Sequence, residues 1–295
     1  MTQPLSLLVA TDLSALSRHA ALRAAMLAGQ MGGTLALLHV LETPALVALR
    51  RLLGQAEADL EQRLATQASD TLTELAQQIA REHAVDAPWH LERGPTVAGI
   101  TNMARQLGAD LLVVGASSAA LLRHWLLGAT ADRLLRAIAS PILFVRQTPH
   151  EPYRTLLIPV DFSSCSALSI ARARSLAPQA QIILLHACAL PFEGKMRFAG
   201  VSDATVMQYR SGARRKATTQ LQLLADQAGL SSHQWTSLVT QGDPGQDILQ
   251  QQVERDADLI VLGKHGAGMT EELLLGSVTQ QVLGQAHCDV LVTAC

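Results

Sequence analysis

The chain has 295 residues, of which 48% are hydrophobic and 16% are charged. This length suits two domains of about 150 residues each, and the hydrophobic fraction excludes a largely disordered protein. Aromatic residues make up only 3%, so the cores must consist of Leu, Val, Ile and Ala, which favours parallel sheets covered by helices. The net charge of −2, without a long basic stretch, argues against nucleic acid as a partner.

The first predicted element is a buried strand within residues 5–10, an apolar run followed by Asp12 and Ser14. A similar run precedes Asp161 and Ser163, and later blocks of the first half also return in the second half at an offset between 147 and 149. These blocks are 35–39 with 182–186, 108–115 with 256–263, 126–128 with 274–276, and 140–145 with 288–293. The repeat predicts a duplicated domain.

The two copies are expected at residues 1–147 and 153–295, joined by a polar linker with two prolines. Within each copy, apolar runs of four to six residues predict buried parallel strands. Helical periodicity between them is clearest at 60–79 and 221–228. Each copy is therefore predicted to be an α/β domain. It should contain a doubly wound, parallel five-stranded sheet with strand order 3-2-1-4-5 and helices on both faces.

In such a sheet the ligand crevice lies beyond the carboxyl ends of strands one and four. In the second copy these ends carry Asp161 and Gly263. Gly263, Gly266 and Gly268 fall within six positions, which lets the backbone turn and approach a ligand closely. The loop matches neither the G-x-x-x-x-G-K-[ST] pattern nor the dinucleotide fingerprint.

A helix is expected to begin at Ser277, because Ser277 and Gln280 have capping-box spacing. The free N–H groups and the positive dipole end of such a helix favour phosphate. The hydroxyls of Ser277 and Thr279 are further candidate donors. We therefore expect a phosphate site here.

The spacing G-x2-G-x9-G-[ST], formed by Gly263, Gly266, Gly276 and Ser277, resembles the ATP-binding signature of the universal stress protein family. The run 159–163 and the second-strand histidine at 186 are also similar to family members that bind ATP. The resemblance covers nearly the whole chain twice, as in the tandem form of the family. It implies a cytoplasmic stress-response protein that binds an adenine nucleotide.

By position, the resemblance implies that Asp161 meets the adenine or ribose and that the backbone around Ala187 lines the adenine pocket. Ala187 stands where many members carry Val, which predicts a looser pocket. The glycine loop and 276–279 would hold ribose and phosphates. ATP is the implied cofactor, and Mg²⁺ with it is left open. The implied binding residues are Pro159, Val160, Asp161, Ala187, Gly263, Lys264, His265, Gly266, Gly268, Gly276, Ser277, Val278 and Thr279.

The first copy departs from this pattern. Ser118 replaces the second glycine, Ala120 stands opposite Gly268, and Ala129 replaces the Ser/Thr. A side chain where positive φ is required is costly, so we expect weak nucleotide binding there, or none. Asp12 is then expected to be a helix-capping carboxylate. An alternative is that this copy binds a small apolar ligand.

Several polar residues have simpler interpretations than chemistry. Lys264 and His265 are expected to be solvated loop residues, and Ser163 and Ser164 to be helix caps. The strand-end histidines at 39 and 186 are expected to make structural hydrogen bonds. The four cysteines show no metal or C-x-x-C spacing, so reduced thiols are expected.

No catalytic residue is therefore predicted, and nothing in the sequence demands an enzyme. The expected function is a nucleotide-dependent sensor or adaptor with an unidentified protein partner. The alternative is a slow ATP hydrolase.

No secretory signal or membrane-spanning run is recognised, so a cytoplasmic protein without membrane contact is expected. The family resemblance also implies that the last strands of the two copies, around Phe144 and 290–292, pair within the chain as a pseudo-dimer. A further homodimer is left open.

Overall fold

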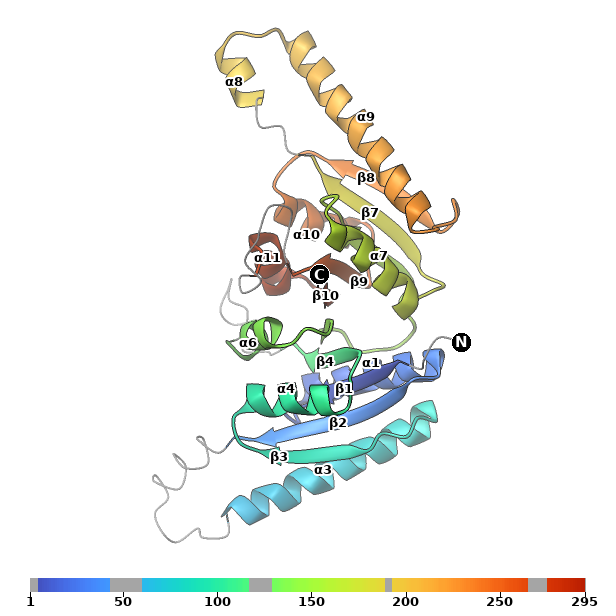
Figure 1. The fold of residues 1–295 in the computed structure, drawn as a ribbon, viewed down its shortest axis with the longest axis vertical. Helices are drawn as coiled ribbons and strands as arrows, with labels where there is room; N and C mark the ends of the chain where they lie inside the picture. Colours follow the sequence, from blue (N-terminus) through green and yellow to red (C-terminus); the bar gives the residue numbers. More distant parts are fainter. Residues whose placement is uncertain (1–4, 43–59, 117–128, 189–192, 265–274, 295) are drawn as a thin grey trace. The chain divides into compact units, whose positions relative to one another are not determined.

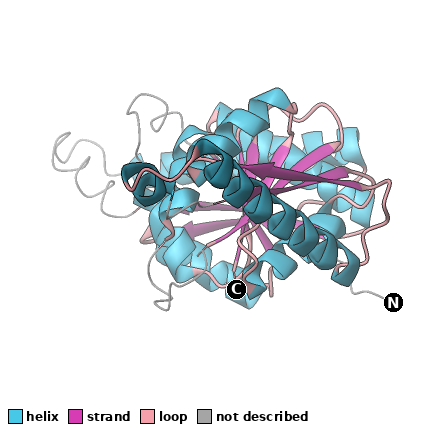
Figure 2. Cartoon of the chain, turned by 90° about the horizontal axis from the view of Figure 1, so that it is seen from above, coloured by secondary structure: helices cyan, strands magenta, loops and turns pink. Residues whose placement is uncertain are grey.

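The computed structural model describes residues 5–42, 60–116, 129–188, 193–264 and 275–294. The chain divides into two compact units, Met1–Pro152 and Tyr153–Cys295. In each unit, helices lie on both sides of a central sheet (Figures 1 and 2).

The first unit has parallel strands in the order β3-β2-β1-β4-β5. Helices α1 and α3 pack together on one side of the sheet, and α4 and α6 pack together on the other. Its elements are β1 (Ser6–Ala10), α1 (Ala15–Met31), β2 (Thr34–Leu41), α3 (Leu60–His83), β3 (Trp89–Arg93), α4 (Thr96–Gln106), β4 (Leu111–Gly115), α6 (Ala129–Ala137) and β5 (Ile142–Val145).

The second unit repeats this plan with the order β8-β7-β6-β9-β10. The prediction of a doubly wound sheet with order 3-2-1-4-5 is confirmed. The elements are β6 (Thr155–Pro159), α7 (Ser164–Leu176), β7 (Gln181–Ala187), α8 (Glu193–Phe198), α9 (Asp203–Gln227), β8 (Trp235–Thr240), α10 (Pro244–Glu254), β9 (Leu259–Gly263), α11 (Ser277–Gln285) and β10 (Asp289–Thr293).

Aliphatic side chains on the inner strands form each core. Leu8, Leu37 and Val113 are completely buried in the first unit, as are Leu157 and Ile260 in the second. Helices cover both faces of these strands, which is why their sequences are continuous apolar runs without polar alternation. In the part of the chain that the structure describes, no helix combines the length and apolarity that a bilayer span requires.

One hydrogen bond at the amino end of the sheet occurs in both units. The Asp110 carboxylate accepts the N–H of Ser6 at 2.9 Å, and the Asp258 carboxylate accepts the N–H groups of Arg154 and Thr155 at 2.7 and 2.9 Å. Each carboxylate precedes the fourth strand of its unit and satisfies backbone donors at the start of the first strand. It thereby ties the two central strands together.

Gly115 is the last residue of β4 and lies against the backbone of α1, where a side chain has no room. A Cβ atom at residue 115 would lie 2.9 Å from the Leu16 carbonyl and from the Ser17 Cα. Backbone atoms cannot yield cheaply, so Gly115→Ala should lower the free energy of unfolding by about 1–3 kcal/mol. Urea unfolding of the whole chain measures this.

Gly212 within α9 is the matched control, since a Cβ atom there would have no neighbour within 4 Å. Gly212→Ala should raise stability by about 0.5–1 kcal/mol, the usual gain in a helix interior. Equal effects of the two substitutions would show that close approach is not the reason for glycine at 115.

Candidate functional site

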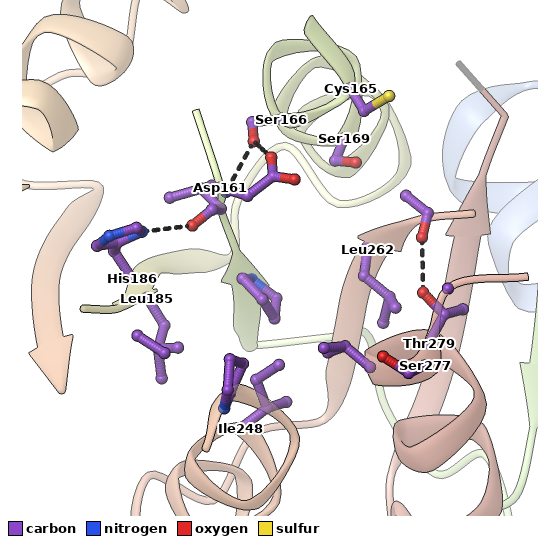
Figure 3. Close-up of a pocket in the computed structure, with 17 residues that line it drawn as sticks. Asp161, Cys165, Ser166, Ser169, Leu185, His186, Ile248, Leu262, Ser277 and Thr279 are labelled. Atoms are coloured by element: carbon purple, nitrogen blue, oxygen red, sulfur yellow. Dashed lines mark hydrogen bonds between the residues drawn. The ribbon is translucent and has the colours of Figure 1, made fainter. Parts of the chain in front are cut away.

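A cavity of ≈360 Å³ lies in the second unit at the carboxyl ends of β6, β7 and β9 (Figure 3). Helices α7, α10 and α11 complete its walls. The cavity therefore occupies the point where the sheet order reverses, the usual ligand position in this class of fold. Nine residues predicted from sequence line it: Pro159, Val160, Asp161, Ala187, Gly263, Gly276, Ser277, Val278 and Thr279.

Of the other predicted residues, Lys264 is described but does not line this cavity. His265, Gly266 and Gly268 lie outside the described residues, so the glycine loop stays a sequence prediction. The sequence analysis missed the side chains that helices supply to the walls, among them Cys165, Ser166, Ser169, Pro244 and Ile248. Their positions in the first turns after two strand ends were the only available signal.

Asp161 is held in place by two serines. One carboxylate oxygen, Oδ1, accepts hydrogen bonds from the N–H and hydroxyl of Ser163, at 3.0 and 2.6 Å, and from the Ser166 hydroxyl at 2.9 Å. Phe162, which lies between Asp161 and Ser163 in the chain, has a φ of +63°, in the left-handed region. Such a conformation persists only where its surroundings enforce it. The turn thus fixes the carboxylate at the cavity wall.

The first unit contains the same turn without the same capping. Leu13 has a φ of +64°, and the Asp12 carboxylate accepts the N–H of Ser14 at 3.0 Å. Burial raises the pKa of Asp12, but hydrogen bonds from Ser14 and Ser17 outweigh burial and lower it overall. The N-cap of α1 is Ser14, whose hydroxyl accepts the Ser17 N–H. The prediction that Asp12 itself caps the helix is therefore wrong.

The corresponding helix start in the second unit also differs from expectation. Ser163 is the N-cap residue of α7, but its side chain makes no capping bond, and its hydroxyl donates to Asp161. Ser164 is already the first residue of the helix. The prediction that Ser164 caps the helix is therefore wrong. Ser163 does occupy the predicted N-cap position, but its side chain does not make the predicted capping bond.

His186 supports the floor of the cavity. A carbonyl oxygen only accepts, so the Nδ1–H of His186 donates to the Val160 carbonyl at 2.8 Å. The Phe162 ring lies against the imidazole with a centroid separation of 4.4 Å. In the first unit His39 makes the same 2.8 Å bond to the Thr11 carbonyl. The prediction that both histidines are structural is confirmed.

Helix α11 begins at Ser277 as predicted, although the predicted capping box is absent. Its N-cap is Gly276, which has no side chain to bond the helix. The first helical backbone bond joins the Gln280 N–H to the Gly276 carbonyl at 2.9 Å. Among the described residues, the N–H groups of residues 277–279 therefore have no partner, and they lie at the positive end of the helix dipole.

Two hydrogen bonds fasten this helix start to the end of β9. The Gly276 N–H donates to the Lys264 carbonyl, and the Thr279 hydroxyl donates to the Gly263 carbonyl, both at 2.9 Å. Thr279 is only 4% exposed. Its single hydroxyl hydrogen is thus used within the protein in this structure, and its donation to a phosphate stays a prediction. Ser277 is exposed and retains that role as a candidate.

Lys264 is not the solvated loop residue that was expected. It is 8% exposed, and its N–H donates to the Thr293 carbonyl at 3.0 Å. Burial lowers the pKa of its ammonium group. Its main chain positions the helix start, whereas its side chain lies within the unit.

The cysteines agree with expectation only in part. Cys188 and Cys288 are buried thiols outside any disulfide, whereas Cys165 takes part in a disulfide. Among the described residues, no group of three or more His, Cys, Asp or Glu side chains is arranged to hold a metal ion.

The universal stress protein family model matches residues 6–146 and again 152–294. The chain belongs to the universal stress protein family. A universal stress protein of Thermus aquaticus is 29% identical over 143 residues, covering 48% of this chain and 98% of the relative. Universal stress protein Rv2623 of Mycobacterium tuberculosis is 28% identical over 216 residues, covering 69% of this chain and 67% of the relative.

Among solved structures, a universal stress protein from Archaeoglobus fulgidus has a TM-score of 0.68 at 19% identity and covers 99% of each chain. At this identity the similarity shows the fold. The two family matches cover nearly the whole chain, so this universal stress protein is of the tandem form.

The lowered pKa of Lys264 predicts a pH-dependent stability. The native state releases this proton at a lower pH than the unfolded chain, whose value is near 10.5. Burial of the charge therefore destabilises the protein below the native pKa, and the penalty disappears as the pH rises to the unfolded value. Compared with Lys264→Met, the unsubstituted protein should gain stability between neutral pH and 10.5.

Urea unfolding at a series of pH values measures the difference. Lys216→Met, on the exposed surface of α9, is the control for general alkaline effects. A stability difference between Lys264→Met and the unsubstituted protein that stays constant with pH would contradict the prediction.

Proposed function

We propose that the second unit of this universal stress protein binds an adenine nucleotide, with ATP as the ligand, and that the chain acts as a nucleotide-dependent sensor or adaptor. The observation that carries this proposal is the cavity at the sheet reversal, which ends on the first turn of α11. Such a helix start binds phosphate through its free N–H groups and its dipole.

The cavity offers an apolar wall for the base. Val160, Leu185, Ala187, Pro244 and Ile248 supply this wall. Its volume of ≈360 Å³ lies within the range of about 300–1,000 Å³ for small-molecule sites. A planar, mostly apolar ring is the part of a nucleotide that suits such a wall.

The polar groups lie where the sugar and phosphates would follow. The fixed Asp161 carboxylate lies at the cavity wall beside Ser166 (Figure 3) and can accept a hydrogen bond from a ribose hydroxyl. The N–H groups of 277–279 and the Ser277 hydroxyl then meet phosphate oxygens, together with the glycine loop that the sequence signature predicts. Mg²⁺, where present, would come with the phosphates.

A binding role is favoured over rapid hydrolysis by the side chains at the cavity. The described lining residues include no Lys or Arg that could stabilise a leaving phosphate. Retention of the nucleotide is the property that a sensor needs.

The proposal predicts one ATP per chain, held intact. Calorimetric titration of the whole chain should give a stoichiometry of one, because the first copy has Ser118 and Ala129 in place of the signature residues. Timed analysis of the same sample should recover ATP. Two equivalent sites would refute the asymmetry, and multiple-turnover ADP release would replace the sensor with a slow ATP hydrolase.

The role of the helix start is tested by removing one N–H group. Gly276 has φ −60° and ψ 144°, a conformation that a following proline accepts. Proline is also tolerated at the first helical position. Ser277→Pro should therefore preserve the helix but remove an N–H group that can bond a phosphate. A hydrogen bond to a charged group contributes about 1.5–3 kcal/mol, so ATP affinity should fall at least about tenfold.

Ser277→Ala is the matched control, since it removes the hydroxyl and keeps the N–H. Its effect on the ATP dissociation constant should be smaller than that of Ser277→Pro. If the alanine variant loses as much affinity as the proline variant, the hydroxyl is the main contact and the backbone mechanism fails.

A further inference from the structure

A second cavity in the same unit, of ≈530 Å³, lies away from the proposed nucleotide site. It is bounded by α7, by the last turns of α9 and by the start of β7. Ile182, near the first residue of β7, lines this cavity, whereas Leu185 and Ala187 at the other end of the strand line the nucleotide cavity. The two cavities thus lie toward opposite ends of one strand.

The two units differ in sequence along the helix that borders this space. Ser14 and Ser163 are the N-cap residues of α1 and α7, so the two helices can be aligned residue by residue. Arg18 then corresponds to Ala167, and Leu22 corresponds to Ala171.

The helix pairs pack differently as a result. In the first unit the Nε–H of Arg18 donates to the side-chain oxygen of Gln78 at 2.9 Å, which joins α1 to α3. In the second unit the aligned residue, Ala167, lines the cavity together with Ala171 and Leu224 of α9. Two large-to-small differences between the copies thus coincide with an open space.

The cavity walls are mainly aliphatic, with one cation. Apolar atoms come from Ala167, Ala171, Ile182, Leu224 and Leu230. Such walls favour a hydrocarbon chain over a polar ligand.

Arg174 supplies the charge. Its Nη1 donates to the Ala228 carbonyl, which leaves further N–H donors of the guanidinium available for a ligand. Among the described residues, Arg174 makes no ion pair with an acidic side chain. An aliphatic slot beside an exposed guanidinium suits a molecule with a hydrocarbon chain and an anionic end.

We propose that this cavity binds a medium-chain fatty acid, with the chain between α7 and α9 and the carboxylate on Arg174. The planar guanidinium matches a carboxylate through paired hydrogen bonds. The volume lies within the range of about 300–1,000 Å³ for small-molecule sites. This cavity has its own lining residues, and the proposal stands whether or not the first cavity binds a nucleotide.

Calorimetric titration of the full chain with decanoate, below its micelle concentration, tests the proposal. We expect saturable binding of one molecule per chain. Ala171→Leu introduces the side chain that the first copy carries at the aligned position, Leu22, and should reduce decanoate affinity at least tenfold. The ATP titration of the same variant should be unchanged, which shows that the unit is still folded.

Two further variants separate shape from charge. Ala204→Leu makes the same substitution at an exposed position of α9 outside the cavity lining, and should leave decanoate binding unchanged. Arg174→Met keeps the length of the side chain and removes the charge. It should weaken decanoate at least tenfold, while decanol binding is retained.

The absence of saturable decanoate binding would overturn the proposal, as would equal affinity in Ala171→Leu. Equal decanoate affinity in Arg174→Met would refute the carboxylate assignment. ATP and decanoate are titrated separately. A chain that binds decanoate but not ATP would therefore contradict the proposed nucleotide function and still support the fatty-acid site.

Discussion

The pairing of β6 with both β7 and β9 determines where a ligand can bind in the second unit. From β6 the chain winds outward through β7 and β8 and then returns to wind through β9 and β10 in the other direction, so the helices of the two halves cover opposite faces of the sheet. The two central strands, β6 and β9, lead to helices on opposite faces, and the crevice lies between their carboxyl ends. Asp161 and Gly263, which are far apart in sequence, therefore lie at one cavity together with the start of α11.

The strand order and the start of α11 could be predicted from sequence because their signals are local and repeated: apolar runs, strand-end Asp and Gly residues, and one glycine-rich spacing. The cavity side chains from helices could not, since a residue such as Ile248 reaches the cavity only through the packing of α10 on the sheet. The burial of Lys264 and the internal use of the Thr279 hydroxyl likewise depend on how α11 meets β9.

The two copies also separate the requirements of folding from those of ligand binding. Both keep the aspartate that ties the central strands, the strand-end histidine bond and the left-handed residue after the first strand. They differ at the glycine signature and at the position of Thr279, where the first copy has Ala131. The scaffold therefore does not require the signature residues, and one copy can vary there while its sheet is preserved.

Helix α7 supplies walls to both cavities of the second unit: Cys165, Ser166 and Ser169 to one, and Ala167, Ala171 and Arg174 to the other. Its 13 residues form a rod about 20 Å long. A tilt or axial rotation of this rod cannot enlarge one chamber without reshaping the other. Any such movement would make the helix a mechanical link between the two cavities. If both bind ligands, thermodynamic reciprocity would then require each ligand to alter the affinity of the other by the same factor.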